Sequence, residues 1–283
     1  MQLVSTQLPP DHNIFLFGDL HDGTITSFRR GWLNLVDMMH SKYDGCKNNY
    51  GVDHGDMIEA ITVNDKRFNL ETTSEPLPLL QAREAVMLRR RISKQLITIL
   101  QGNHELALQN FGDIASDIAF QLEVPYGTYS CKVIVKDKKN NPVYKMFCTH
   151  GRKSINSTAD DPIRRRANME LQLKRHLKFN FGDCSVMTKG HTHRLLVCKP
   201  TSELYLTDDG KEIHKDYTTG VQQGGGYIHP DARWYGNTGS FTRLFTLGAS
   251  SYAERAEYDP MELGFLILKV RDYQIIDLVP YYL

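Results

Sequence analysis

Short apolar runs that end in glycine recur along the first two thirds of the chain. Residues 14–17 have the length and composition of a buried strand. Similar strands are predicted at residues 50–54, in QLITIL (95–100) and in CSVMTK (184–189). The segment YSCKVIVKDKKNNPVYKMFCTHG (129–151) predicts two alternating strands around a polar turn.

Apolar residues at helical spacing lie between these strands. In residues 27–43, an apolar face is formed by Phe28, Trp32, Leu35, Val36 and Met39. Further helices are expected at residues 78–92, 112–124 and 162–180. Alternating strands and helices are typical of a layered α/β fold.

From about residue 194 the pattern changes to strands and turns. Residues 203–220 carry an Asp-Gly pair between two alternating segments, which predicts a β-hairpin. Residues 264–270 and 273–282 predict two closing strands. Because no repeat, low-complexity segment or linker marks a boundary, we expect residues 1–283 to form a single domain with a β-rich C-terminal part.

The composition limits the classes of function. The chain is 41% hydrophobic and 24% charged, with a net charge of +1, so charge gives no whole-protein argument for nucleic-acid or membrane binding. Its five cysteines are widely spaced and form no CxxC pair, which argues against a disulfide framework and a zinc knuckle. Without a visible secretory signal or an apolar run of roughly 18 residues, a cytoplasmic protein with no membrane partner is expected.

Residues that commonly bind metals follow the glycine turns. The turns are FGDLHDG (17–23), HGDMIE (54–59), QGNHE (101–105), CTHG (148–151) and KGHTH (189–193). They supply the candidates Asp19, His21, Asp56, Asn103, His104, His150, His191 and His193. Because strand ends converge along one edge of an α/β sheet, we expect these side chains to meet. The remaining histidines lack this context and are expected on the surface or in the core: His12, His40, His54, His176, His214 and His229.

In this order, the five blocks resemble the signature motifs of the calcineurin-like metallophosphoesterase superfamily. They run from residue 18 to residue 193, and the later NTGS (237–240) is similar to the NPGS turn of phosphodiesterase-type members, with threonine in place of proline. The chain also broadly resembles phosphoesterases of phage genomes. The resemblance implies an α/β/β/α sandwich with a metal site at the carboxyl ends of the strands.

The resemblance also implies a centre with two metal ions. One ion would be held by Asp19, His21, Asp56 and His193. The second would share Asp56 and add Asn103, His150 and His191. Mixed carboxylate, amide and imidazole ligands suit transition metals better than Ca²⁺ or Mg²⁺, so we expect two divalent transition-metal ions, with Mn²⁺ favoured and Fe, Zn²⁺ or Ni²⁺ as alternatives. Such a pair activates hydroxide for attack on a phosphoester.

The resemblance assigns a different role to His104, which would lie beside the substrate phosphate rather than bind a metal. It would stabilise the transition state or protonate the leaving oxygen, with Glu105 orienting its ring and Glu59 supporting the ligands from outside. Asp56 and His104 are therefore the expected catalytic residues. Asn103 and His104 are expected to contact the substrate.

Hydrolysis of a phosphodiester is the favoured activity. GDLHDG and GDMIEA depart from the GDxHG and GDxVDRG motifs of protein phosphatases in the same superfamily. A phosphomonoesterase acting on proteins or small molecules and a non-catalytic binding scaffold are the alternatives. The expected substrate is a nucleotide or a nucleic acid, since residues 152–180 carry eight basic and three acidic side chains that could bind RNA or DNA. The same charges also fit a solvated helix face.

Overall fold

The computed structural model describes residues 1–218 and 223–283, which form two large β-sheets and one two-stranded sheet. The first sheet has six strands, in the order β1 (Gln2–Gln7), β5 (Ser130–Lys136), β6 (Pro142–Thr149), β7 (Val186–Lys189), β11 (Trp234–Thr238) and β8 (Leu195–Cys198). The second has five, in the order β13 (Gln274–Tyr282), β12 (Gly264–Arg271), β2 (His12–Phe17), β3 (Asn49–Asp53) and β4 (Leu96–Ile99).

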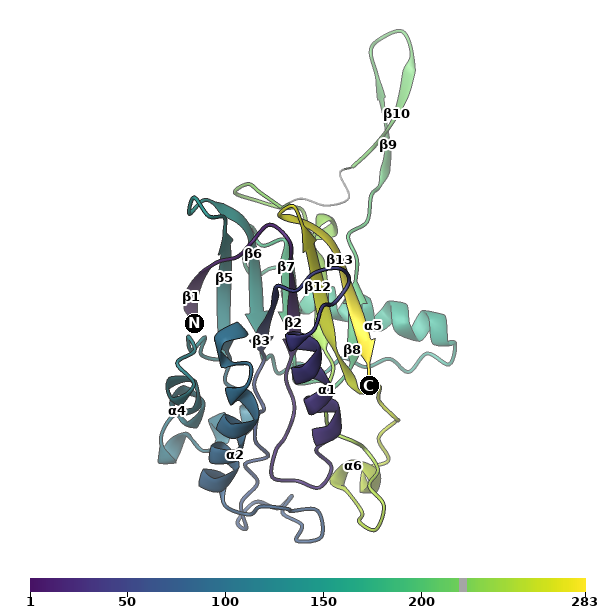
Figure 1. The fold of residues 1–283 in the computed structure, drawn as a ribbon. Helices are drawn as coiled ribbons and strands as arrows, with labels where there is room; N and C mark the ends of the chain where they lie inside the picture. The colour runs from purple at the N-terminus through teal and green to yellow at the C-terminus, as the bar shows by residue number, and fades with distance from the viewer. Residues whose placement is uncertain (219–222) are drawn as a thin grey trace.

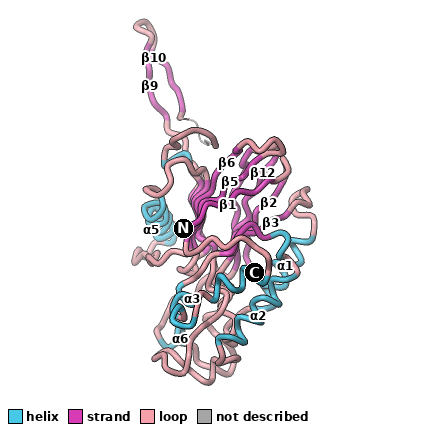
Figure 2. Tube along the Cα trace, turned by 90° about the vertical axis from the view of Figure 1, so that its left-hand side faces the viewer, coloured by secondary structure: helices cyan, strands magenta, loops and turns pink. Residues whose placement is uncertain are grey.

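Helices cover the outer face of each sheet (Figures 1 and 2). The second sheet is covered by α1 (Arg29–His40), α2 (Pro78–Arg90) and α4 (Ile114–Gln121), and the first by α5 (Pro162–Leu177). Two short helices, α3 (Asn103–Ala107) and α6 (Tyr252–Arg255), lie in loops, as do the 3-10 turns η1 (Ser93–Gln95), η2 (Gln109–Phe111) and η3 (Pro230–Ala232). The predicted α/β/β/α sandwich is confirmed.

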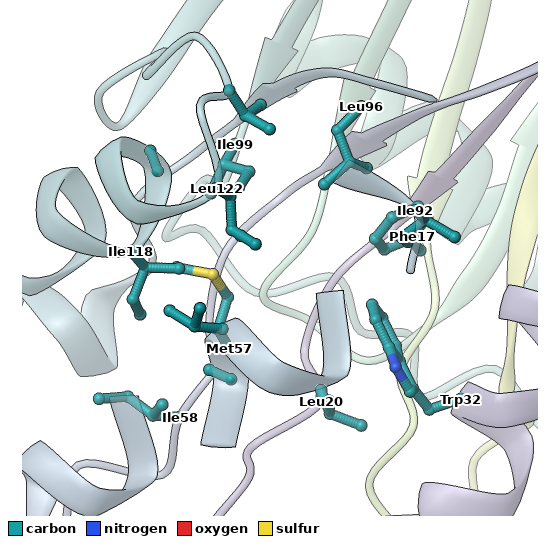
Figure 3. Close-up of a cluster of buried hydrophobic side chains, with 14 of the residues drawn as sticks. Phe17, Leu20, Trp32, Met57, Ile58, Ile92, Leu96, Ile99, Ile118 and Leu122 are labelled. Carbon is teal, nitrogen blue, oxygen red and sulfur yellow. The ribbon is translucent and has the colours of Figure 1, made fainter. Parts of the chain in front are cut away.

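Strand β2 contains an uninterrupted apolar run because both of its faces are buried. Phe15 and Phe17 point toward the helices, whereas Ile14 and Leu16 pack between the two sheets. Both faces of the strand are buried, so alternation with polar residues is absent. Figure 3 shows Phe17 in the cluster beneath the helices, where its ring packs edge-on against Trp32 with centroids 5.4 Å apart.

The strand directions bring the glycine turns to one edge. In the second sheet β2, β3 and β4 are parallel neighbours, and in the first sheet β6, β7 and β11 are parallel neighbours. Asp53 is in register with both Phe17 and Ile99, so three turns leave the second sheet at the same level. The turns after β6 and β7 likewise leave the first sheet together, since Thr149 is in register with Lys189.

The C-terminal strands are interleaved with the earlier ones. β8 and β11 join the first sheet, and β12 pairs with β2 in the second. The predicted hairpin is present as β9 (Leu204–Asp208) and β10 (Ile213–Tyr217), and it extends away from the sheets (Figure 1). Residues 219 and 220 of the predicted hairpin segment lie outside the described residues. Among the described residues, no helix is long and apolar enough to cross a membrane.

Candidate metal centre

All eight candidate residues meet at the edge where the parallel strands end. They follow five strands by short turns: Asp19 and His21 follow β2, Asp56 follows β3, Asn103 and His104 follow β4, His150 follows β6, and His191 and His193 follow β7. Asp19, His21, Asp56 and His150 are buried, while the other four are half-buried. The site is therefore a polar pocket that is open on one side.

The turns hold several of these residues in the left-handed backbone conformation, which residues other than glycine rarely adopt. The φ angles are 55° at Asp19, 51° at His21, 50° at Asp56, 71° at His191 and 52° at His193. Such strain costs about 1–3 kcal/mol per residue and is concentrated at functional sites. Its presence at five candidate ligands supports a functional role for these turns.

Two glycines allow the turns after β3 and β4 to touch. Gly55 has a φ of 87°, and a side-chain carbon there would overlap the backbone of Gly102. A side-chain carbon at Gly102 would in turn overlap the carboxylate of Asp56. Because this space is open, the backbone N–H of His104 donates to Asp56 Oδ1 at 2.9 Å.

A first group of ligand atoms is formed by Asp19, His21 and His193, which lie within 4.8 Å of one another. His193 Nε2 is 3.4 Å and His21 Nε2 is 3.9 Å from Asp19 Oδ1. The other oxygen of Asp19 accepts the backbone N–H of His191 at 3.1 Å. One oxygen of Asp19 thus holds the turn that carries His191, and the other oxygen faces the imidazoles of His21 and His193.

A second group is formed by Asp56, His150 and His191, again within 4.8 Å of one another. His150 Nε2 is 3.3 Å from Asp56 Oδ2 and 2.9 Å from Asn103 Oδ1. The two groups meet at Asp56, because the same Oδ2 is 3.7 Å from His21 Nε2 in the first group. Asp56 Oδ2 therefore lies within reach of imidazoles from both groups.

Groups behind the ligands set the orientation of two imidazoles. His21 Nδ1 lies 3.0 Å from the Glu59 carboxylate, and His150 Nδ1 lies 2.7 Å from the carbonyl of His54. With these nitrogens as hydrogen-bond donors, Nε2 of each ring presents its lone pair to the site, as metal-bound histidines do. Glu59 therefore lies where sequence reasoning expected a supporting residue.

The expected role of Glu105 is wrong. Glu105 is fully buried and accepts backbone N–H groups of Asp56, Met57, Ile58 and Gly102 at distances of 2.6–3.1 Å. The ring of His104 is instead held by the backbone carbonyl of Glu59, which accepts from Nδ1. The physical reason is that α3 turns the Glu105 side chain inward, where four amides require an acceptor.

The NTGS segment supports the site, a role that its likeness to a family motif did not specify. Asn237 accepts from Thr192 Oγ1 at 3.0 Å and donates to the carbonyl of Arg194, on either side of His193. Ser240 Oγ donates to the backbone carbonyl of Asp19 at 3.0 Å. The segment therefore ties the turn after β7 to the turn after β2.

The charges of the site favour a cation. Asp19 Oδ1 is buried without a hydrogen-bond donor among the described residues, which is costly for a carboxylate. Burial opposes protonation of His150, yet the carboxylates of Asp56 and Asp19 raise the pKa of its imidazole to about 9. Burial also opposes protonation of His104, but the carboxylates of Asp56 and Glu59 outweigh this effect and raise its pKa. The carboxylates therefore create a negative potential that favours binding of positive ions.

The other histidines named above and the helical part of the basic segment lie outside this site. His12 and His54 are core residues whose rings bond to Tyr144 and Thr188, and His40, His214 and His229 are exposed. The basic segment forms α5, which packs on the outer face of the first sheet. Arg166 pairs with Glu170 and Lys174 pairs with Asp231, so part of its charge is neutralised within the chain.

Comparisons with known proteins give structural likenesses but no sequence-level match. No protein-family model and no curated protein matches the chain. Among solved structures, the chain is similar to a metallophosphoesterase from Sphaerobacter thermophilus, with a TM-score of 0.41 and 15% sequence identity. The alignment covers 95% of this chain and 88% of that one. At this level of similarity two chains need not share a reaction, so the function depends on the side chains described above.

Proposed function

We propose that the protein is a metal-dependent phosphoesterase that hydrolyses phosphodiesters at a centre for two divalent transition-metal ions. The observation that supports this most strongly is the position of Asp56 Oδ2, between His21 Nε2 at 3.7 Å and His150 Nε2 at 3.3 Å. Each imidazole belongs to a separate group of three ligand residues. A carboxylate oxygen within reach of both groups is suited to bridge two cations.

The residues fit such ions. Asp19, His21 and His193 would hold one ion, His150, His191 and Asn103 the other, and Asp56 both. Nitrogen and oxygen donors in this mixture suit Mn²⁺, Fe, Zn²⁺ or Ni²⁺, and Mn²⁺ is our first choice. When bound, the ions would supply Lewis acidity that lowers the pKa of water and neutralises phosphate oxygens.

His104 would act on the substrate rather than on an ion. Its ring lies 4.5 Å from the ring of His21 between centroids, and its Nδ1 is bound to the Glu59 carbonyl. The remaining nitrogen, Nε2, is then available at the open side of the site. There it would donate a hydrogen bond to a phosphate oxygen or a proton to the leaving oxygen. Asn103, beside it at the start of α3, would help to place the phosphate.

The diester preference is supported by the motifs around the ligands. The turn after β2 contains Asp22 where protein phosphatases have glycine, and the turn after β3 continues as IEA rather than as an arginine-containing segment. Asp22 is buried and bound to Arg29 at 2.7 Å, so it adds no ligand. A phosphomonoesterase is the alternative that the same centre could support.

Hydrolysis of two chromogenic substrates tests this proposal. Protein stripped of metal and reloaded with Mn²⁺ should hydrolyse bis(p-nitrophenyl) phosphate more efficiently than p-nitrophenyl phosphate, and elemental analysis should find a transition metal. A strong preference for the monoester would favour the phosphatase alternative. Activity that survives in protein shown to be free of metal would overturn the proposal.

A further inference from the structure

A cavity of about 220 Å³ adjoins the centre on the side of His104. Its wall includes His21, His193 and His104, whereas the second ligand group, Asp56, His150 and His191, does not line it. A group in the cavity would therefore be attached to the phosphate on the His104 side. In the proposed function this is the side of the leaving oxygen.

Three loops enclose the cavity: residues 22–28, 59–75 and 241–261. The first two are joined by the hydrogen bond from the N–H of Ile25 to the carbonyl of Thr72, at 2.9 Å. The third is joined to the second by Asn69, whose side chain donates to the carbonyl of Ser250 at 3.2 Å. Because hydrogen bonds connect the three loops, the walls of the cavity are held in fixed positions relative to one another.

The size of the cavity limits what can enter. Drug-sized ligands occupy pockets of about 300–1,000 Å³, so a volume of 220 Å³ suits one substituent of a substrate rather than a whole large ligand. A compact organic group carried by a small molecule would fill it.

The wall combines apolar and polar groups with two arginines, Arg67, which pairs with Asp65 at 2.8 Å, and Arg243. Ile61, Leu244 and Met261 supply apolar surface. Threonine hydroxyls also line the wall, and they donate to backbone carbonyls of the chain. Arg243 donates to the carbonyl of Ile25 at 2.7 Å and lies over the ring of Phe28. No carboxylate of the described residues forms an ion pair with Arg243, so no neighbouring carboxylate offsets its positive charge at the cavity wall.

We propose that this cavity binds the leaving group of a small phosphodiester, and that Arg243 selects a leaving group with hydrogen-bond acceptors. The inference rests on the proposed function and names its substrate class: a dinucleotide or another small diester whose leaving alcohol has the size of a nucleoside. Apolar walls would cover the faces of a ring, and the arginine would bind the acceptors at its edge.

Steady-state kinetics of Mn²⁺-loaded variants test the pocket. Arg243→Gln removes the charge, Ala253→Phe fills the cavity from its wall, and Arg90→Gln changes an exposed arginine on α2 as a control. The KM for the dinucleoside monophosphate UpU should rise about tenfold in the first two variants, the effect of one lost charged hydrogen bond or a blocked contact. Inorganic phosphate has no substituent, so its inhibition constant should stay at the wild-type value in all three.

Binding of free uridine to the metal-free protein, measured by calorimetry, gives a readout that does not depend on activity. Uridine should bind to wild-type and Arg90→Gln protein and bind about tenfold more weakly to Arg243→Gln. Unchanged KM and uridine affinity in both pocket variants would overturn the inference while leaving the phosphoesterase proposal intact. Internal cleavage of a 20-nucleotide strand at a kcat/KM at least as high as that for UpU would also overturn the inference. A wild-type protein that hydrolyses no diester would instead contradict the proposed function.

Discussion

Glu105 accepts the backbone N–H of Asp56 at 3.1 Å, so the residue after a candidate acid–base histidine supports the proposed metal bridge. The same carboxylate accepts the N–H groups of Met57 at 2.6 Å and Gly102 at 2.8 Å. It therefore holds the turn after β3 against the turn after β4. The relationship connects the stability of the fold to the geometry of the site.

Replacing this carboxylate should destabilise the protein. Glu105→Ala leaves buried amides without an acceptor, and each such loss costs about 1–3 kcal/mol. We expect the free energy of unfolding in urea to fall by about 3 kcal/mol or more. Glu105→Gln keeps one acceptor oxygen and should lose less. Equal stability of Glu105→Ala and wild-type protein would show that the amides find water or another partner.

Asp56→Asn should lower metal content and activity together. The amide keeps the shape of the side chain but removes the negative charge that two cations would share. We expect less bound transition metal per chain and a loss of diesterase turnover of at least about 100-fold. Inductively coupled plasma analysis beside a bis(p-nitrophenyl) phosphate assay measures both. Full metal content in an Asp56→Asn protein would speak against a bridging role.

His104→Ala should separate catalysis from metal binding. Because the Nδ1 of His104 is bound to the Glu59 carbonyl and the ring is proposed to act on phosphate, metal content should stay near wild type. Turnover should fall by about 10²–10⁴-fold, the range for a positioned acid–base group. His214→Ala, on the exposed hairpin, serves as the control. If His104→Ala lost an ion, His104 would have to be counted among the ligands.

Stability should decrease as the pH is lowered through the range in which His12 titrates. Burial lowers the pKa of His12 from 6.5 to about 4, and its Nε2 lies 2.6 Å from the hydroxyl of Tyr144. Between these values the unfolded chain binds a proton that the folded chain does not, so stability is highest above about pH 6.5 and falls toward pH 4. Urea unfolding at several pH values should show a smaller decrease for His12→Gln than for wild type. The exposed His40→Gln should behave like wild type.

The sequence alone determined most of the elements and named the candidate residues of the centre. Uninterrupted apolar runs such as residues 14–17 can be satisfied by burial on both faces, so β2 was predictable without any knowledge of its neighbours. Metal-type residues in glycine turns after such strands had to gather at one sheet edge. Strand β1 (Gln2–Gln7), by contrast, was not predicted, because QLVSTQ is mostly polar and its place at the sheet edge comes from pairing with β5.

The tertiary structure decided which groups serve one another across the site. Glu59 supports His21 from 38 positions away, and Ser240 binds the carbonyl of Asp19 from 221 positions away. Local patterns carry no information about such pairs, which depend on how two sheets pack and where their loops cross. For the same reason the inward position of Glu105 and the cavity beside His104 could not be predicted. Periodicity along a chain determines its strands and helices, whereas contacts between distant segments determine the shape and support of a site.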